Sequence, residues 1–66
     1  MKNTIKVERA KKNITQEDLA QKLGVSRQSV NAIETGKFVP STVLALKMAR
    51  YFKISVHDVF ELEKED

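Results

Sequence analysis

The segment Thr15–Glu34 constrains the fold of this chain more than any other part of its sequence. Apolar residues recur in it at the spacing of one helix face, first before Gly24 and again after it. Glycine readily takes the left-handed backbone conformation that ends a helix, so the pattern predicts two short amphipathic helices joined by a tight turn. The residues expected to lock the two helices together are Leu19, Leu23, Val30 and Ile33.

The length of 66 residues and the absence of cysteine set a second constraint. A single domain of this size buries only about 60% of the surface that its unfolded chain exposes, so well-packed helices and oligomerisation must supply its stability. Without cysteine there is no disulfide and no thiolate zinc site, and His57 alone cannot build a metal site. We therefore expect one domain over residues 1–66, with no metal and no cofactor.

Neither a signal-peptide pattern nor an apolar run of about 18 residues is visible, and together with the missing cysteines this predicts a cytoplasmic protein with no membrane partner. The charge is unevenly placed. Residues 1–37 carry eight basic and four acidic side chains, whereas residues 38–66 carry four basic and five acidic ones. A cationic first half suits a phosphate backbone, although an ordinary solvated surface would give the same numbers.

The other segments also show helical periodicity, with hydroxyl residues where helices would begin. We expect further helices over about residues 4–12 and 41–52, and a short one after Ser55. The inward-facing residues expected in the first of these are Ile5, Val7, Ala10 and Ile14. The fold class is thus all-α, a compact five-helix bundle. A short β-ribbon pairing Met1–Asn3 with Glu61–Glu63 is a further arrangement open to the chain ends.

Residues 16–35 meet the physical requirements of a helix-turn-helix. Ala20 is small where the second helix of the motif crosses the first, and Gly24 supplies the turn. On the outward face, Arg27 offers two donors to guanine O6 and N7, while Gln28 and Asn31 can bond adenine N6 and N7. Each of these residues alone could be a solvated or packing residue. Their coincidence at the correct offsets makes DNA binding the leading interpretation.

Near the start of each motif helix, Gln16 and Ser26 can fix the register on phosphate groups without reading sequence. The motif and its flanks resemble the Xre-type family of phage-repressor-like regulators, with a similarity that covers essentially the whole chain. The matching segments are Thr15–Ala20, Leu23–Val30, Ile33–Glu34, Gly36–Lys37, Pro40–Ser41, Leu44–Phe52 and Ile54–Val56. Within the family the chain is most similar to short stand-alone repressors, such as those of cytolysin operons.

The resemblance implies a lambda-repressor-like bundle that binds double-stranded operator DNA as a two-fold dimer. It implies base reading by Arg27, Gln28, Asn31 and Ala32. It also implies backbone contacts by Gln16, Ser26, Ser29, Lys37 and Phe38, and a structural ion pair between Arg9 and Glu34. One residue departs from the family pattern: Glu8 stands where the family usually has an apolar residue, so either Val7 compensates or Glu8 has a partner of its own, such as a nearby lysine.

The neutral to acidic, apolar-rich region 43–62 is expected to form the dimer interface, because one helix-turn-helix module has too little contact area for strong specificity. The candidate interface residues are Val43, Leu46, Ile54, Val56, Phe60 and Leu62. All of them could instead belong to the core of a single chain.

We expect a homodimeric repressor, with an antitoxin or protein-binding adaptor that uses the same fold as the alternative. In the second case a protein partner, at present unknown, would be the main ligand. No nucleophile–base constellation, phosphate-binding loop or acidic cluster suggests an enzyme. A pH switch at His57 and general RNA binding have little support, because His57 stands alone and the aromatic residues are few.

Overall fold

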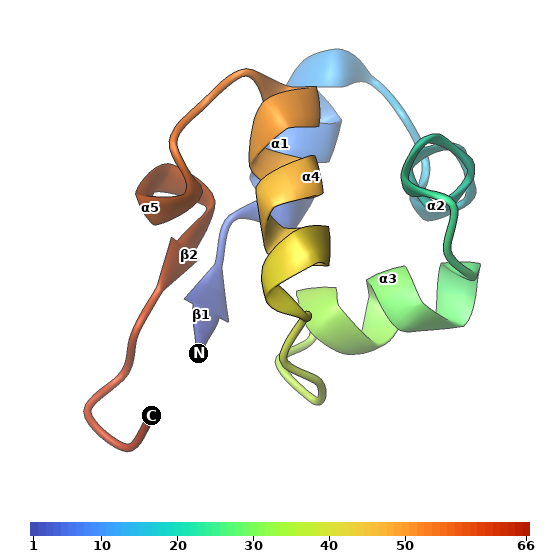
Figure 1. Ribbon diagram of the computed structural model, residues 1–66. Helices are drawn as coiled ribbons and strands as arrows, with labels where there is room; N and C mark the ends of the chain where they lie inside the picture. Colours follow the sequence, from blue (N-terminus) through green and yellow to red (C-terminus); the bar gives the residue numbers. More distant parts are fainter.

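The computed structural model describes residues 1–66 and contains five helices and a two-stranded antiparallel sheet (Figure 1). The elements in chain order are β1 (Lys2–Asn3), α1 (Ile5–Lys12), α2 (Gln16–Leu23), α3 (Arg27–Glu34), α4 (Thr42–Phe52), α5 (Val56–Val59) and β2 (Phe60–Glu61). The predicted five-helix bundle is confirmed. None of the helices is both long and apolar enough to cross a lipid bilayer.

Side-chain caps begin α2, α3, α4 and α5 at the hydroxyl residues that the sequence indicated. At α2, Thr15 Oγ1 accepts from the Asp18 N–H at 3.0 Å, and Asp18 Oδ2 accepts from the Thr15 N–H at 3.0 Å. Ser26 caps α3 in the same way, with its Oγ accepting from the Ser29 N–H at 3.1 Å. Each cap satisfies a backbone donor that the helix itself leaves free, which fixes where the helix starts.

The turn between α2 and α3 depends on the left-handed conformation of Gly24, with φ of 75° and ψ of 32°. No atom lies within 4 Å of the position that a Cβ would occupy there, so the backbone angle rather than crowding favours glycine. The Val25 N–H then donates to the Ala20 carbonyl at 3.0 Å and closes the end of α2. The predicted role of Gly24 is confirmed.

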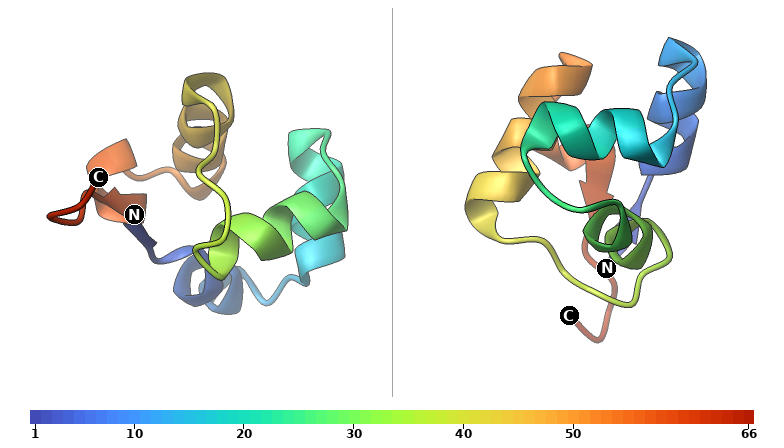
Figure 2. Two further views of the ribbon diagram at one scale, coloured as in Figure 1. Left: turned by 90° about the horizontal axis from the view of Figure 1, so that it is seen from below. Right: turned by 90° about the vertical axis from the view of Figure 1, so that its right-hand side faces the viewer.

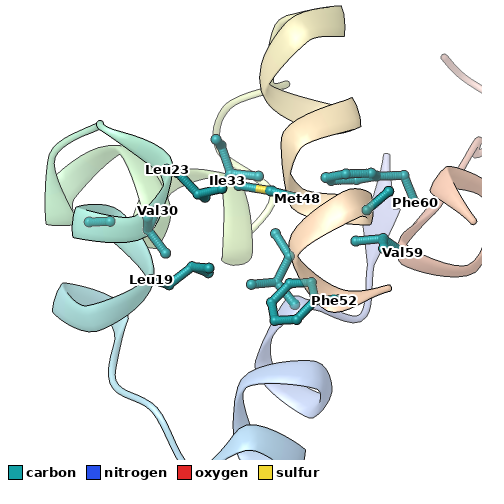
Figure 3. Packing of buried hydrophobic residues seen from close by; sticks show 11 residues of the cluster. Leu19, Leu23, Val30, Ile33, Met48, Phe52, Val59 and Phe60 are labelled. Carbon is teal, nitrogen blue, oxygen red and sulfur yellow. The ribbon is translucent and has the colours of Figure 1, made fainter. Parts of the chain in front are cut away.

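One core joins all five helices and β2 (Figure 3). Its buried members are Ile5, Leu19, Ala20, Leu23, Val30, Ile33, Met48, Ala49, Phe52, Val59 and Phe60. Met48 points from α4 toward Ile33 of α3, so it connects the helix-turn-helix to the second half of the chain (Figure 3). The predicted locks between α2 and α3 are all in this core, which confirms that prediction.

The prediction for the inward face of α1 is wrong at two positions. Val7 is 54% exposed and Ala10 is also exposed, so of the residues within α1 only Ile5 is fully buried. The residues that face the bundle recur at helical spacing, but three of them are charged: Glu8, Arg9 and Lys12. Their long side chains cover the surface that an apolar stripe would otherwise cover.

The chain ends pair as the β-ribbon that the sequence left open, with Lys2 opposite Glu61 and Asn3 opposite Phe60. The strand β2 begins one residue earlier than the expected segment. The Thr4 N–H donates to the Val59 carbonyl at 2.9 Å and extends the connection. The ribbon thus holds the start of α1 against the end of the bundle.

Candidate nucleic-acid interface

The helices α2 and α3 cross at a steep angle, as the right-hand view of Figure 2 shows: α2 runs across the view while α3 is seen nearly end-on. Ala20 of α2 is 1% exposed, and Leu19 of α2 and Val30 of α3 are fully buried in the core that the two helices share. This packing fixes which side of α3 faces the solvent.

The outward side of α3 carries Arg27, Gln28 and Asn31, which are all exposed and lie within one helix face. Ala32 is half-buried, because the loop after α3 folds back on it: the Lys37 and Phe38 N–H groups donate to its carbonyl at 2.9 and 3.1 Å. The structure therefore brings three of the four predicted base-reading residues together on an open polar surface and sets the fourth at its edge.

A hydrogen bond between α2 and α3 was not predicted from the sequence. Gln16 Nε2 donates to Asn31 Oδ1 at 3.1 Å and links the first residue of α2 to the predicted reading face of α3. The two residues are 15 positions apart in the chain, and no local spacing pairs them. Only the crossing of the two helices reveals the contact.

The predicted backbone-contacting residues lie at the starts of α2 and α3 and in the loop that follows α3. Gln16 begins α2, and Ser26 and Ser29 lie at the start of α3, where their hydroxyls bond each other at 3.0 Å. Lys37 and Phe38 occupy the loop after α3, and the Phe38 side chain is 59% exposed. An exposed aromatic ring beside a free lysine, next to a polar helix face, suits contact with sugar and phosphate.

The orientation of α3 is fixed at its far end by Arg9 and Glu34. Arg9 Nε donates to Glu34 Oε2 at 3.0 Å and Arg9 Nη2 to Glu34 Oε1 at 2.8 Å, a bidentate pair between α1 and α3. Arg9 Nη1 donates in addition to the Ile14 carbonyl at 3.0 Å. The hydrogen bonds that Arg9 donates to the Glu34 carboxylate raise the pKa of the Arg9 guanidinium. Asn3 Nδ2 holds the same end of α3 through the Ile33 carbonyl at 2.9 Å.

The neighbouring Glu8 has the lysine partner that its position requires. Lys11 Nζ lies 3.3 Å from Glu8 Oε2, one helical turn away. Lys12, from the same helix, lies over the Tyr51 ring of α4 with 5.1 Å between its Nζ and the ring centroid. Glu8 and Lys12 of α1 therefore each have an interaction partner.

The candidate dimer residues separate into three groups. Val43, Leu46 and Leu62 are exposed by 64%, 54% and 76%, Ile54 and Val56 are half-buried, and Phe60 is 8% exposed. Phe60 therefore contributes mainly to the core of its own chain. Beside the exposed group lies a hollow of about 280 Å³, lined by Met1, Val39, Pro40, Thr42, Ala45, Leu46, Val56 and Phe60.

Comparison with known proteins decides the family. The helix-turn-helix family model matches residues 5–59, which is most of the chain. The chain belongs to this helix-turn-helix family. The match runs from the first residue of α1 to the last of α5, so the family's fold accounts for every helix described above.

Relatives of this helix-turn-helix protein match it from end to end. A protein of Methanocaldococcus jannaschii, named an uncharacterized HTH-type transcriptional regulator, is 53% identical over 66 residues that cover 100% of both chains. The Bacillus subtilis protein YgzD, named in the same way, is 48% identical and also covers 100% of both. An Archaeoglobus fulgidus protein of the same designation is 44% identical, over 100% of this chain and 93% of its own.

Proposed function

We propose that this protein is a DNA-binding transcriptional regulator that acts as a homodimeric repressor on an inverted-repeat operator. The family match and the relatives' names support regulation through DNA rather than enzymatic activity. The observation that carries the proposal is the outward face of α3, where Arg27, Gln28 and Asn31 are exposed together on a helix whose opposite side is locked into the core.

In the proposed complex α3 lies in the major groove, which is wide enough to admit an α-helix. Arg27 is suited to a guanine and Gln28 to an adenine, since their donors and acceptors match the edges of those bases. Gln16 at one side of the motif, with Lys37 and Phe38 at the other, would contact the flanking backbone. These backbone contacts would fix the register of the protein on the DNA, and the base contacts from α3 would select the DNA sequence that is bound.

The homodimer is supported by the apolar surface that surrounds Val43 and Leu46. Both side chains lie on α4 and are more than half exposed, next to the hollow lined by Pro40 and Val56. Exposed apolar surface of this kind is characteristic of contact sites. A two-fold dimer would place two α3 helices in successive major grooves, about 34 Å apart. Such a dimer would repress by occupying DNA that the transcription machinery needs, which requires no additional domain.

The test is selection of bound sequences from a random DNA pool at near-physiological salt, followed by measurement of stoichiometry on the selected sequence. An enriched inverted repeat, bound by two chains with half-sites one helical turn apart, is the expected result. Failure to enrich any sequence, with only salt-sensitive binding, would contradict the proposal. The exposed apolar surface would then favour a protein-binding adaptor.

A further inference from the structure

Three hollows of the molecule share lining residues and form one continuous surface over α4, α5 and β2. The central one is the apolar hollow beside Leu46 described above. On one side it shares Phe60 with a hollow that Glu61 also lines. On the other side it shares Leu46 with a hollow that Lys47 and Arg50 also line. The row of hollows is therefore acidic at one end, apolar in the centre and basic at the other end.

We propose that two copies of the protein associate through this surface, with the acidic end of each copy against the basic end of the other. A two-fold interface uses the same patch on both copies, so every contact occurs twice. An axis that crosses the row at its apolar centre brings Glu61 next to the partner's Lys47 and the partner's Arg50. An axis along the row would oppose like charges, which is costly. The inference rests on the proposed homodimer and specifies how its two chains are arranged.

The basic end has no acidic partner within its own chain. Lys47 and Arg50 are exposed on α4, and neither takes part in an ion pair. The hollow that both line on the side of α2 adds Lys22 and Tyr51 but no acidic residue. In the ribbon views α4 lies between α2 on one side and α5 with β2 on the other (Figure 1 and the left-hand view of Figure 2). The unpaired cations thus lie across α4 from the acidic end.

The proposed DNA contact of α2 is at the other end of that helix. Gln16 is the first residue of α2, whereas Lys22, which borders the basic end of the row, lies in its last turn. At 1.5 Å per residue the two positions are about 9 Å apart along the helix axis. The basic end is therefore separate from the proposed contact of Gln16 with the DNA backbone, and a carboxylate-bearing partner is the occupant that its charge favours.

The acidic end is formed by β2 and the residues that follow it. Residues 61–66 contain four acidic side chains and one basic one, Lys64. Glu61 and Glu65 are exposed and take part in no ion pair, although Lys2 lies opposite Glu61 in the ribbon. The other two carboxylates contact the terminal amine. Glu61 and Glu65 are thus the carboxylates that remain for a partner.

Each charged end also carries an exposed apolar side chain. Leu62 follows Glu61 and is 76% exposed, and Leu46 precedes Lys47 and is 54% exposed. Both would be covered in the proposed arrangement, together with the hollow between them. Buried apolar area then supplies the affinity, while the charges at the edge fix the orientation of the two copies.

The experiment compares the natural protein with two charge-reversed variants in the absence of DNA. The first variant is Lys47→Glu with Arg50→Glu, and the second is Glu61→Lys with Glu65→Lys. Either variant alone opposes like charges at both ends of the dimer, so its dissociation constant should rise about tenfold or more. Sedimentation equilibrium measures the change. All four side chains are exposed, and circular dichroism checks that both variants keep the helical fold.

The decisive sample is an equal mixture of the two variants. In a mixed dimer each reversed pair meets its reversed counterpart and each natural pair meets its natural one, so both ends attract again. Native mass spectrometry should find mainly mixed dimers, and their dissociation constant should lie within about threefold of that of the natural protein. The matched control is the first variant mixed with the natural protein. One end of that dimer still repels, so it should associate more weakly.

Variants that dimerise as tightly as the natural protein would overturn the inference and leave the homodimer standing. A loss of DNA affinity in the first variant would then assign Lys47 and Arg50 to the DNA backbone instead. A mixture that fails to recover association would also overturn the arrangement. If the natural protein is a monomer both alone and on its selected DNA, the proposed homodimer itself fails, and this arrangement fails with it.

Discussion

The helix-turn-helix in the first half of this molecule and α4 in the second half differ in how far they bury their large apolar side chains. In α2 and α3 the large apolar side chains are buried, with Leu19 and Val30 fully inaccessible, and the outward surface is polar. In α4, by contrast, Val43 and Leu46 remain 64% and 54% exposed although Met48 of the same helix is buried. The pair α2 and α3 buries its large apolar side chains within one chain, whereas α4 leaves apolar area uncovered. This contrast is the basis for proposing that the first half recognises DNA and the second half associates with another copy.

The largest effect is expected from the substitution of Leu46 by glutamate, which places a charge in the exposed apolar surface of α4. A charge in the proposed two-fold interface occurs twice in the dimer, so we expect dimer dissociation to increase by about 100-fold or more. Sedimentation equilibrium measures the change. Val7→Glu is the matched control, since Val7 is also 54% exposed but lies on α1. Equal effects of the two substitutions, or none from Leu46→Glu, would remove the association role of α4.

Glu34→Ala should destabilise the first half by about 3–5 kcal/mol, because it leaves the partly buried Arg9 guanidinium without its bidentate partner. Urea unfolding followed by circular dichroism gives the change in free energy. Glu17→Ala removes an exposed acid of α2 and should change stability by no more than about 0.5 kcal/mol. A loss below about 1 kcal/mol in Glu34→Ala would mean that the ion pair does not hold α3 in place.

The polar surface itself divides into reading and positioning residues, which Gln28 and Lys37 should separate. Gln28→Ala should cost about 1–3 kcal/mol at one operator position and leave non-specific binding intact. Lys37→Ala should weaken binding to all sequences and reduce the slope of log affinity against log salt by about one. Titration of matched and mismatched operators at several salt concentrations tests both. A uniform loss in Gln28→Ala would make it a positioning residue.

The smallest effect concerns the cap of α2. Hydrogen bonds from the Thr15 N–H and hydroxyl lower the pKa of the Asp18 carboxyl below its ordinary value. Because the pKa is lower in the folded state, the cap contributes its full stability above the unfolded value of about 3.9 and loses it as pH falls further. From about pH 5 down to about pH 2, the melting temperature of Asp18→Asn should therefore fall less than that of the natural protein.

Glu17→Gln serves as the control for the cap, since it removes a carboxylate from the same turn without removing the hydrogen bonds to Thr15. The two variants should differ in melting temperature toward neutral pH and converge in acid, where the Asp18 carboxyl of Glu17→Gln is protonated. Identical acid profiles for both would show that net charge, not the cap, sets the pH dependence.

Features fixed by neighbouring residues were predictable from the sequence. The caps at Thr15 and Ser26 and the turn at Gly24 depend on a few consecutive residues, and each is where the sequence placed it. The locks between α2 and α3 follow from helical spacing alone. These local rules were sufficient to predict the motif and the order of the helices.

Features that depend on side chains from distant segments were not predictable in the same way. Spacing assigned Val7 to the core because it counts only apolar residues, whereas Arg9 and Lys12 cover the bundle with long charged side chains. The bond from Gln16 to Asn31 arises from the angle between two helices and has no sequence pattern of its own. The ion pair between Arg9 and Glu34 was indicated only by resemblance to a family.

The ribbon that joins the chain ends also determines when the protein can fold during its synthesis. Asn3 and Thr4 bond to residues 59 and 60, and Val59 and Phe60 are themselves core residues. The core therefore cannot close until residues 59 and 60 have been synthesised and have left the exit tunnel of the ribosome. A nascent chain that stops before them has no complete native fold with which to recognise a ligand. Such a truncated product would be a target for proteolysis instead of a partly active competitor.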